Sequence, residues 1–319
     1  MSNRMEPMAP AVKLGVKLGG LELSNPMIAA SGTFGWGFEF ERIAGFSNAD
    51  LGAIVLKGTT LRARTGNASP RIVETAGGAG ILNSIGLENP GVEVVVRDYL
   101  PKLAGIKPKV IANIAGSEVE EYAEVAKHFD ACEGIAAIEV NVSCPNVKEG
   151  GLAFGTDPKT CGRVVAGVRK STGKPVIVKL TPNVTDIRVV ARAAVEAGAD
   201  ILSLINTLTG VAVDVRTRKP ILGNVAGGLS GPAVKPVGLA KVLEVHRMGL
   251  GVPIIGMGGI SCAEDALEYM IAGARAFSVG TIMFRDHTTP AQVIGELVDW
   301  CKLLGVTDIN DLVGTIKLQ

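Results

Sequence analysis

The chain has 319 residues, of which 47% are hydrophobic and only 4% aromatic, so Val, Ile, Leu and Ala must supply most of its core. Its 41 glycines are spread singly and in pairs between apolar runs, which excludes a collagen-like or low-complexity chain. The 32 basic and 31 acidic residues give a net charge of +1, and this balance argues against a nucleic-acid or anionic-membrane surface as the main function.

Cysteine and histidine usage predicts a reduced protein without a metal site. The five cysteines contain no CxxC pair and the three histidines are widely scattered, so no spacing suits a zinc ion or an iron–sulphur cluster. No uncharged apolar run reaches about 18 residues, and residues 1–10 contain no apolar core of signal-peptide length. We therefore expect a soluble, cytoplasmic protein.

Short β-type runs alternate with helical patterns along the chain. The first expected element is a small hairpin at residues 13–23, where Gly19-Gly20 separates two apolar-alternating arms. Eight almost continuously apolar runs follow, as is typical of parallel strands covered on both faces. They are residues 26–30, 53–57, 110–114, 137–142, 176–180, 201–206, 253–257 and 276–280.

Helical patterns occupy the intervals between these runs. Ser117 and Thr185 stand where two of the helices should begin, and Gly198 and Gly273 stand where two should end. The expected helices are residues 92–103, 118–129, 158–170, 186–197, 234–248, 263–271 and 290–304.

Eight strands alternating with helices predict an α/β fold of the (β/α)8 TIM-barrel type, with the hairpin closing its bottom. We find no linker and no internal repeat, so we expect a single domain over residues 1–319, with residues 1–11 a loose extension. Long gaps after strands 2, 4 and 6 mark insertions, which should form the lids and walls of a site: residues 58–90, 143–157 and 207–233.

Polar or glycine residues follow the carboxyl ends of these strands, where the catalytic groups of a barrel gather. They are Ser31, Lys57, Asn113, Asn141, Lys179, Asn206-Thr207, Gly258-Gly259 and Gly280-Thr281. Glycines after strands 7 and 8 let backbone N–H groups approach a phosphate of a cofactor or substrate. The alternative is that these glycines only make tight turns.

Lys57 and Lys179 end apolar strands, where an unpaired ammonium is costly, so each should face an anion or an electron-rich ring. Three interpretations remain open: a Schiff-base lysine, a cation beside the N1/C2 carbonyl of a flavin, or a lysine that reaches from the barrel mouth into water.

Cys144 lies in the loop after strand 4, where a thiol could act as nucleophile or general base, although most single cysteines are packing residues. We expect Cys132, Cys161, Cys262 and Cys301 to be packing residues. Side-chain amides on the rim would match the alternating C=O and N–H edge of a pyrimidine-like ring, or could simply stabilise turns: these are Asn83, Asn141, Asn146 and Asn206.

From about Val12 onward the chain resembles the catalytic subunit of class 1B dihydroorotate dehydrogenases. The similar motifs are Ala30-Ser31-Gly32-Thr33-Phe34-Gly35, Val55-Leu56-Lys57-Gly58, Asn83-Ser84-Ile85-Gly86-Leu87, Asn141-Val142-Ser143-Cys144-Pro145-Asn146, Gly227-Gly228-Leu229-Ser230-Gly231, and the pairs Gly258-Gly259 and Gly280-Thr281. Together these motifs are very specific, whereas the glycine pairs alone are shared by many FMN barrels.

The resemblance implies FMN-dependent oxidation of (S)-dihydroorotate to orotate in pyrimidine biosynthesis, with Cys144 taking the C5 proton while the C6 hydride goes to flavin N5. By position, the residues implied to hold FMN are Ser31, Lys57, Gly58, Asn113, Asn141, Lys179, Ile205, Gly231, Gly258, Gly259, Gly280 and Thr281. Those implied to hold the substrate are Lys57, Asn83, Ser84, Ile85, Gly86, Leu87, Asn141, Asn206 and Thr207.

The segments 147–151 and 154–157 resemble the 1B loop rather than that of the fumarate-using 1A enzymes. A 1B subunit pairs with an iron–sulphur flavoprotein that carries FAD and a 2Fe–2S cluster and passes electrons to NAD+. The resemblance therefore implies one FMN per chain and a homodimer core within a heterotetramer.

Three alternatives remain. The first is another flavin barrel, a 1A or dihydropyrimidine dehydrogenase-like enzyme, which differs in its electron acceptor. The second is a Schiff-base aldolase that uses Lys57 or Lys179 and can be trapped by borohydride. The third is a non-catalytic phosphate-binding barrel, which would show no turnover.

Overall fold

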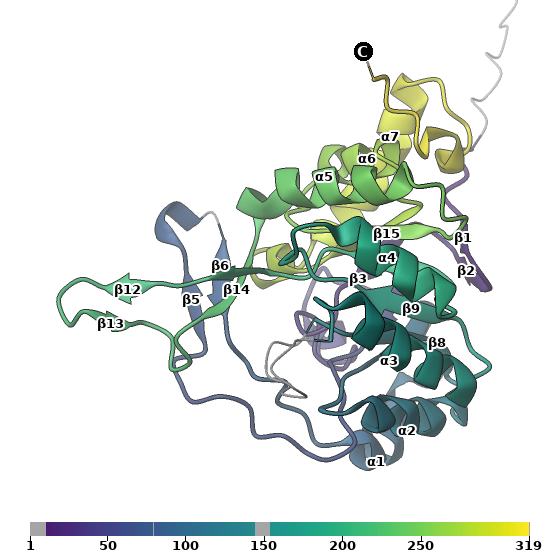
Figure 1. Ribbon diagram of the computed structural model, residues 1–319. Helices are drawn as coiled ribbons and strands as arrows, with labels where there is room; N and C mark the ends of the chain where they lie inside the picture. The colour runs from purple at the N-terminus through teal and green to yellow at the C-terminus, as the bar shows by residue number, and fades with distance from the viewer. Residues whose placement is uncertain (1–10, 79, 144–153, 319) are drawn as a thin grey trace, which may run out of the picture.

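Eight short apolar segments lie side by side as parallel strands and close into a barrel (Figure 1). In this computed structural model, residues 11–78, 80–143 and 154–318 are described. Around the barrel the strands follow one another in chain order: β3 (Met27–Ala29), β4 (Ala53–Val55), β7 (Lys109–Ile114), β8 (Ile135–Asn141), β9 (Val176–Lys179), β10 (Ile201–Leu204), β15 (Ile254–Met257) and β16 (Ala276–Val279). All eight predicted strands and the (β/α)8 barrel are confirmed.

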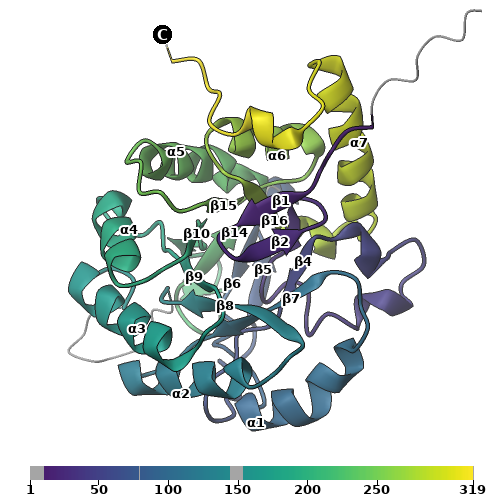
Figure 2. The same cartoon turned by 90° about the vertical axis from the view of Figure 1, so that its right-hand side faces the viewer.

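Helices surround the barrel and cover its outer face (Figure 2). They are α2 (Val119–Asp130), α3 (Pro158–Ser171), α4 (Ile187–Glu196), α5 (Lys235–His246), α6 (Ala263–Ile271) and α7 (Thr289–Leu303). Because helices cover one face of the strands and side chains fill the interior, both faces of the strands are buried, which explains their continuous apolar runs.

Most of the predicted helix boundaries hold within a few residues. Gly198 and Gly273 have φ of 106° and 122°, as expected of residues that end helices. The predicted starts are each one residue early: the N-caps are Glu118, which makes no side-chain capping bond, and Asp186, whose carboxylate accepts from the backbone N–H of Arg188.

The segment predicted as one helix at residues 92–103 contains three successive helix types. It consists of α1 (Val92–Val94), the π-helix η4 (Val95–Tyr99) and the 3-10 helix η5 (Leu100–Leu103). Pro101 lies in the last of these, and its missing N–H interrupts a regular α-helical ladder. The prediction of a single regular helix was therefore wrong, although the span is helical.

The predicted hairpin is present as β1 (Val16–Leu18) and β2 (Leu21–Leu23), paired antiparallel. Its turn residue Gly19 has φ of 56° and lies against Asp200, next to the start of β10. The neighbouring Gly20 lies against Pro175, just before β9. The hairpin therefore covers the amino-terminal end of the barrel, as predicted.

Two of the insertions join in one antiparallel sheet that stands beside the barrel (Figure 1). Its order is β11 (Leu208–Gly210), β14 (Gly227–Ser230), β6 (Ile81–Asn83) and β5 (Ile72–Glu74). The hairpin of β12 (Val213–Asp214) and β13 (Lys219–Pro220) projects from this sheet. Most of the third insertion, residues 144–153, lies outside the described residues.

Within the described part of the chain, none of the helices combines the length and the apolar character that a membrane crossing requires.

Candidate active site

A cavity of about 810 Å³ opens at the carboxyl ends of the barrel strands. At least one residue at or just after each of the eight strands lines it, and the insertion sheet forms a further wall through residues such as Ile81, Asn83 and Ser230. This volume suits a cofactor with a small substrate beside it.

The structure brings all the described residues of the predicted site together around this one cavity. They are Ser31, Lys57, Gly58, Asn83, Ser84, Ile85, Gly86, Leu87, Asn113, Asn141, Lys179, Ile205, Asn206, Thr207, Gly231, Gly258, Gly259, Gly280 and Thr281. Cys144 and Asn146 lie outside the described residues. These residues come from segments as far apart in the chain as Ser31 and Thr281, and the fold places them around one cavity. The role of each residue stays a prediction.

One end of the cavity is built from main chain that can bind an anion. Gly258 and Gly259 have φ of 123° and 72°, and a Cβ at Gly259 would lie 2.9 Å from the carbonyl oxygen of Gly231. Among the described residues, no acceptor bonds the backbone N–H of Gly259, Gly280 or Thr281. Main-chain N–H groups without an acceptor, beside glycines that leave room for a ligand, fit a phosphate. Tight turns alone would not require them.

The two lysines line the cavity, and neither has an ion-pair partner among the residues that the structure describes. The Lys179 side chain is buried, with the residue 7% exposed, and Lys57 is partly buried. In the described parts of the chain, no carboxylate lies within 4.0 Å of either ammonium. The interpretation in which the side chain reaches into water is therefore wrong for Lys179. An anion or an electron-rich ring in the cavity would offset the cost of burying this charge.

Unpaired polar atoms also surround the cavity. Asn113 is fully buried and donates from Nδ2 to Glu139 Oε1 at 2.6 Å, but its Oδ1 has no hydrogen-bond partner among the described residues. The hydroxyl of Ser84 is likewise buried without a partner there. Buried polar groups are normally paired, so these atoms indicate that a polar ligand belongs in the cavity.

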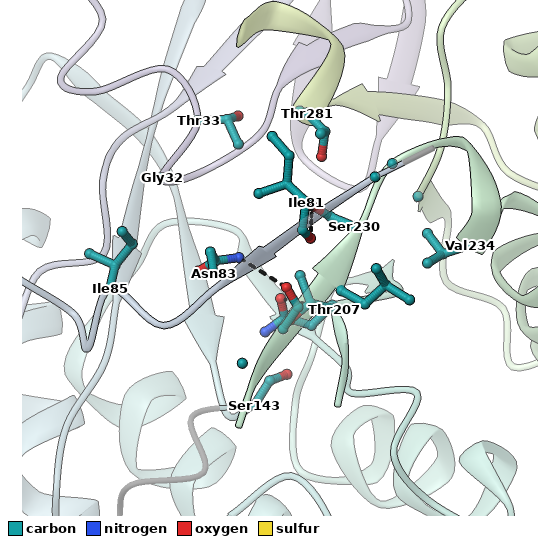
Figure 3. Close-up of a pocket in the computed structure, with 18 of the residues that line it drawn as sticks. Gly32, Thr33, Ile81, Asn83, Ile85, Ser143, Thr207, Ser230, Val234 and Thr281 are labelled. Atoms are coloured by element: carbon teal, nitrogen blue, oxygen red, sulfur yellow. Dashed lines mark hydrogen bonds between the residues drawn. The ribbon is translucent and has the colours of Figure 1, made fainter. Parts of the chain in front are cut away.

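Hydrogen bonds between the insertions hold the substrate-side wall. Asn83 Nδ2 donates to the carbonyl of Gly228 at 3.3 Å (Figure 3). A Cβ at Gly228 would lie 2.1 Å from Thr207 Oγ1, so only glycine lets Thr207 take this place. Figure 3 shows Ser143 at the bottom of the view and Thr281 at the top, with Asn83, Thr207 and Ser230 of this wall between them.

Glu139 is a charged residue of the site that the sequence analysis assigned no role. It is 2% exposed in the barrel interior, where it accepts from Asn113 Nδ2 and, at 3.1 Å, from the hydroxyl of Ser203. Its signal was available, because it is the one acidic residue within the apolar run of β8. We infer that Glu139 orients the Asn113 amide beside the cavity.

Replacing Glu139 by alanine is expected to lower the free energy of unfolding by about 2–4 kcal/mol, because two buried donors lose their acceptor. Urea denaturation of the chain measures this change. Ser203→Ala is the matched control, since it removes one bond but leaves Asn113 paired, and its loss should be smaller. Equal urea midpoints for Glu139→Ala and the unchanged chain would contradict this role.

The other cysteines are placed as packing residues. Cys161 in α3 and Cys301 in α7 are buried, and burial raises the pKa of the Cys161 thiol to about 12. Cys132 follows α2. Cys262 is the N-cap of α6, in the loop that follows strand β15. None of these four thiols lines the cavity.

Sequence comparison places this chain among known proteins. A sequence profile of the family described as dihydroorotate dehydrogenase matches residues 13–300. Three similar relatives are each named dihydroorotate dehydrogenase B (NAD(+)), catalytic subunit. The relative from Desulforudis audaxviator is 53% identical over 303 residues, which is 95% of this chain and 97% of the relative.

The relative from Desulforamulus reducens is 52% identical over 307 residues, 96% of this chain and 99% of the relative. The relative from Pelobacter propionicus is 51% identical over 302 residues, 95% of this chain and 98% of the relative. Profile and relatives thus cover the barrel, both insertions of the sheet and every residue of the cavity. This chain is an oxidoreductase that belongs to the dihydroorotate dehydrogenase family.

Proposed function

We propose that the chain is the FMN-binding catalytic subunit of an NAD+-linked enzyme that oxidises (S)-dihydroorotate to orotate in pyrimidine biosynthesis. The observation that carries the proposal is one cavity that combines three features of the described residues: main-chain N–H groups without an acceptor at one end, two lysines without an ion-pair partner, and several side-chain amides. The relatives' names point to the same activity.

The residues at the anion-binding end would hold the FMN phosphate, chiefly through the N–H groups of Gly259, Gly280 and Thr281. Lys179 would lie beside the ring, where its buried charge stabilises negative charge that develops on the flavin. When bound, FMN supplies the acceptor for the hydride that leaves C6 of the substrate.

The amides of the cavity offer complementary donors and acceptors to a dihydropyrimidine ring. Asn141 Oδ1 accepts from the backbone N–H of Ser143, and Asn206 Oδ1 accepts from that of Thr207. Neither Nδ2 group has an acceptor within the described part of the chain, so both could donate to ring carbonyls. Asn83 uses Nδ2 internally, which leaves its Oδ1 to accept from a ring N–H. Lys57 would pair with the substrate carboxylate.

The proton at C5 would be taken by Cys144. This assignment rests on the chain position of Cys144 directly after Ser143, which lines the cavity and donates from its hydroxyl to the carbonyl of Lys179 at 3.1 Å. That bond fixes the start of the loop to the end of the neighbouring strand β9. A free thiol has a pKa of about 8.5, and only its thiolate form can accept a proton. To act as a general base close to neutral pH, the thiol therefore needs surroundings that stabilise the thiolate.

The pairing of Lys57 with a carboxylate predicts which ring is oxidised. Dihydroorotate should reduce the flavin of the chain. Dihydrouracil lacks the carboxylate and should reduce it at least about 100-fold more slowly, because the partly buried ammonium of Lys57 would remain unpaired. Anaerobic reduction with each compound measures this difference. Equal rates would favour the dihydropyrimidine dehydrogenase-like alternative.

The path of the electrons is proposed from the resemblance to class 1B dihydroorotate dehydrogenases. Electrons would pass through a partner subunit with FAD and a 2Fe–2S cluster to NAD+, in a heterotetramer built on a homodimer of this chain in the cytoplasm. NAD+ reduction by dihydroorotate should appear only when the iron–sulphur flavoprotein is added.

Fumarate reduction by the chain alone would support a 1A enzyme instead. Borohydride trapping of a substrate on Lys57 or Lys179 in colourless protein would support an aldolase.

A further inference from the structure

We propose that Tyr269 is a positioning residue that aims the phosphate-binding N–H groups after β15 and thereby sets the preference of the site for a phosphorylated flavin. Tyr269 lies on α6, is fully buried, and does not line the cavity. The inference deepens the proposed function and rests on it.

The hydroxyl of Tyr269 reaches the rear of the glycine turn. It lies 2.8 Å from the carbonyl oxygen of Gly258, 3.3 Å from that of Met257 and 3.4 Å from that of Lys235. A phenol has one hydrogen to donate, and the shortest contact assigns it chiefly to Gly258. Burial raises the pKa of Tyr269, so the hydroxyl stays a donor throughout the working pH range.

Holding this carbonyl orients the N–H group on the opposite side. The C=O of Gly258 and the N–H of Gly259 belong to one planar trans peptide unit, so they point in opposite directions. With the carbonyl turned toward Tyr269, the N–H of Gly259 points away from the helix. This is one of the N–H groups that has no acceptor in the described parts of the chain. Gly258 and Gly259 both have positive φ, and without a fixed partner such a glycine pair can rotate its peptide plane at little cost.

The ring that carries this hydroxyl is tightly packed between helix α5 and strand β15. A Cβ at Gly238 in α5 would lie 2.0 Å from the Tyr269 hydroxyl oxygen, and a Cβ at Gly256 in β15 would lie 2.5 Å from the ring. The two glycines therefore provide a slot for the tyrosine between helix and strand. The packing fixes the hydroxyl to a degree that a flexible side chain could not.

Lys235, which lies beside Gly259, is paired with carboxylates and is therefore not free to bind the phosphate. Lys235, at the start of α5, donates to Asp265 at 2.6 Å and to Glu268 at 2.8 Å, both on α6. Asp265 also accepts from the backbone N–H of Ser261, which fixes the far side of the turn. With Lys235 occupied by these carboxylates, anion recognition at this turn depends on main-chain N–H groups and hence on their orientation.

The test compares FMN with riboflavin, which shares the ring but lacks the phosphate. The unchanged apoprotein should bind FMN more tightly than riboflavin, as measured by quenching of flavin fluorescence. Tyr269→Phe keeps the ring in its slot and removes the donor. It should raise the Kd for FMN about five- to tenfold and leave the Kd for riboflavin within about twofold.

Tyr122→Phe is the matched control. Tyr122 is equally buried on α2, and its hydroxyl donates to the carbonyl of Asn141 at 2.9 Å, on a strand that does not bear the glycine turn. It should change both dissociation constants by the same factor. The ratio of the two constants isolates the phosphate end even if a variant is less stable.

Two results would count against different statements. A Tyr269→Phe protein that keeps the wild-type ratio of riboflavin to FMN affinity would overturn the role of Tyr269 and leave the proposed function standing. A wild-type apoprotein that binds neither flavin would overturn the proposed function itself.

Discussion

Replacing Cys144 by alanine is expected to leave flavin binding intact and to slow flavin reduction by dihydroorotate about 10²-fold or more. The reason is that the variant lacks the group proposed to take the C5 proton, and a positioned general base contributes a factor of this size. Anaerobic stopped-flow bleaching of the flavin band measures the rate of reduction directly, without contributions from later electron transfer.

Cys132→Ala is the matched control for this experiment. Cys132 lies beside the end of α2, away from the cavity, and its thiol donates to the carbonyl of His128. The flavin of the Cys132→Ala variant should be reduced by dihydroorotate at the same rate as that of the unchanged chain. Unaltered reduction kinetics in Cys144→Ala would remove this thiol from the mechanism.

Replacing Lys179 by methionine is expected to weaken FMN binding about tenfold or more while raising the stability of the apoprotein. Both effects have one cause: the ammonium is buried without a carboxylate partner in the described part of the chain, so it costs free energy until a ligand compensates it. Methionine keeps a similar length and removes the charge. Flavin fluorescence titration and urea denaturation of apoprotein measure the two effects.

Lys302→Met serves as the control, because Lys302 is exposed on α7 and forms a surface ion pair with Asp299. It should change neither FMN affinity nor stability appreciably. A Lys179→Met apoprotein that is less stable than the unchanged chain would show that the lysine has a structural partner rather than a ligand to bind.

The barrel could be predicted from the sequence because each of its strands is covered on both sides, so that local apolar runs report burial directly. The run containing Ile177 and the run containing Ile255 are examples, each buried and each followed by a polar or glycine residue at the cavity. Since all carboxyl ends of the strands meet at one face, finding the strands also located the site.

The sheet made by the insertions could not be predicted in this way. Asn83 and Gly228 are 145 residues apart in the chain, and the glycine-rich strand β14 lacks the alternation that identifies a half-buried strand. The pairing depends on two loops leaving the barrel near one another, which is a property of the finished fold.

The roles of Glu139 and Tyr269 could not be predicted from the sequence, although Glu139 stands out there as the one acidic residue of an apolar run. Glu139 matters because Asn113 on the adjacent strand β7 and Ser203 on β10 donate to it. Tyr269 matters because two glycines open a slot that lets its hydroxyl reach the rear of the phosphate turn. Both roles depend on side-chain contacts between different elements of the fold, which a local sequence pattern does not report.

The most direct test of the central claim uses the purified chain without any partner. Its absorption spectrum should show bound flavin, one FMN per chain, and anaerobic addition of dihydroorotate should bleach that flavin with release of an equivalent amount of orotate. A colourless chain that takes up no FMN on reconstitution, or a bound flavin that dihydroorotate leaves oxidised, would contradict the account.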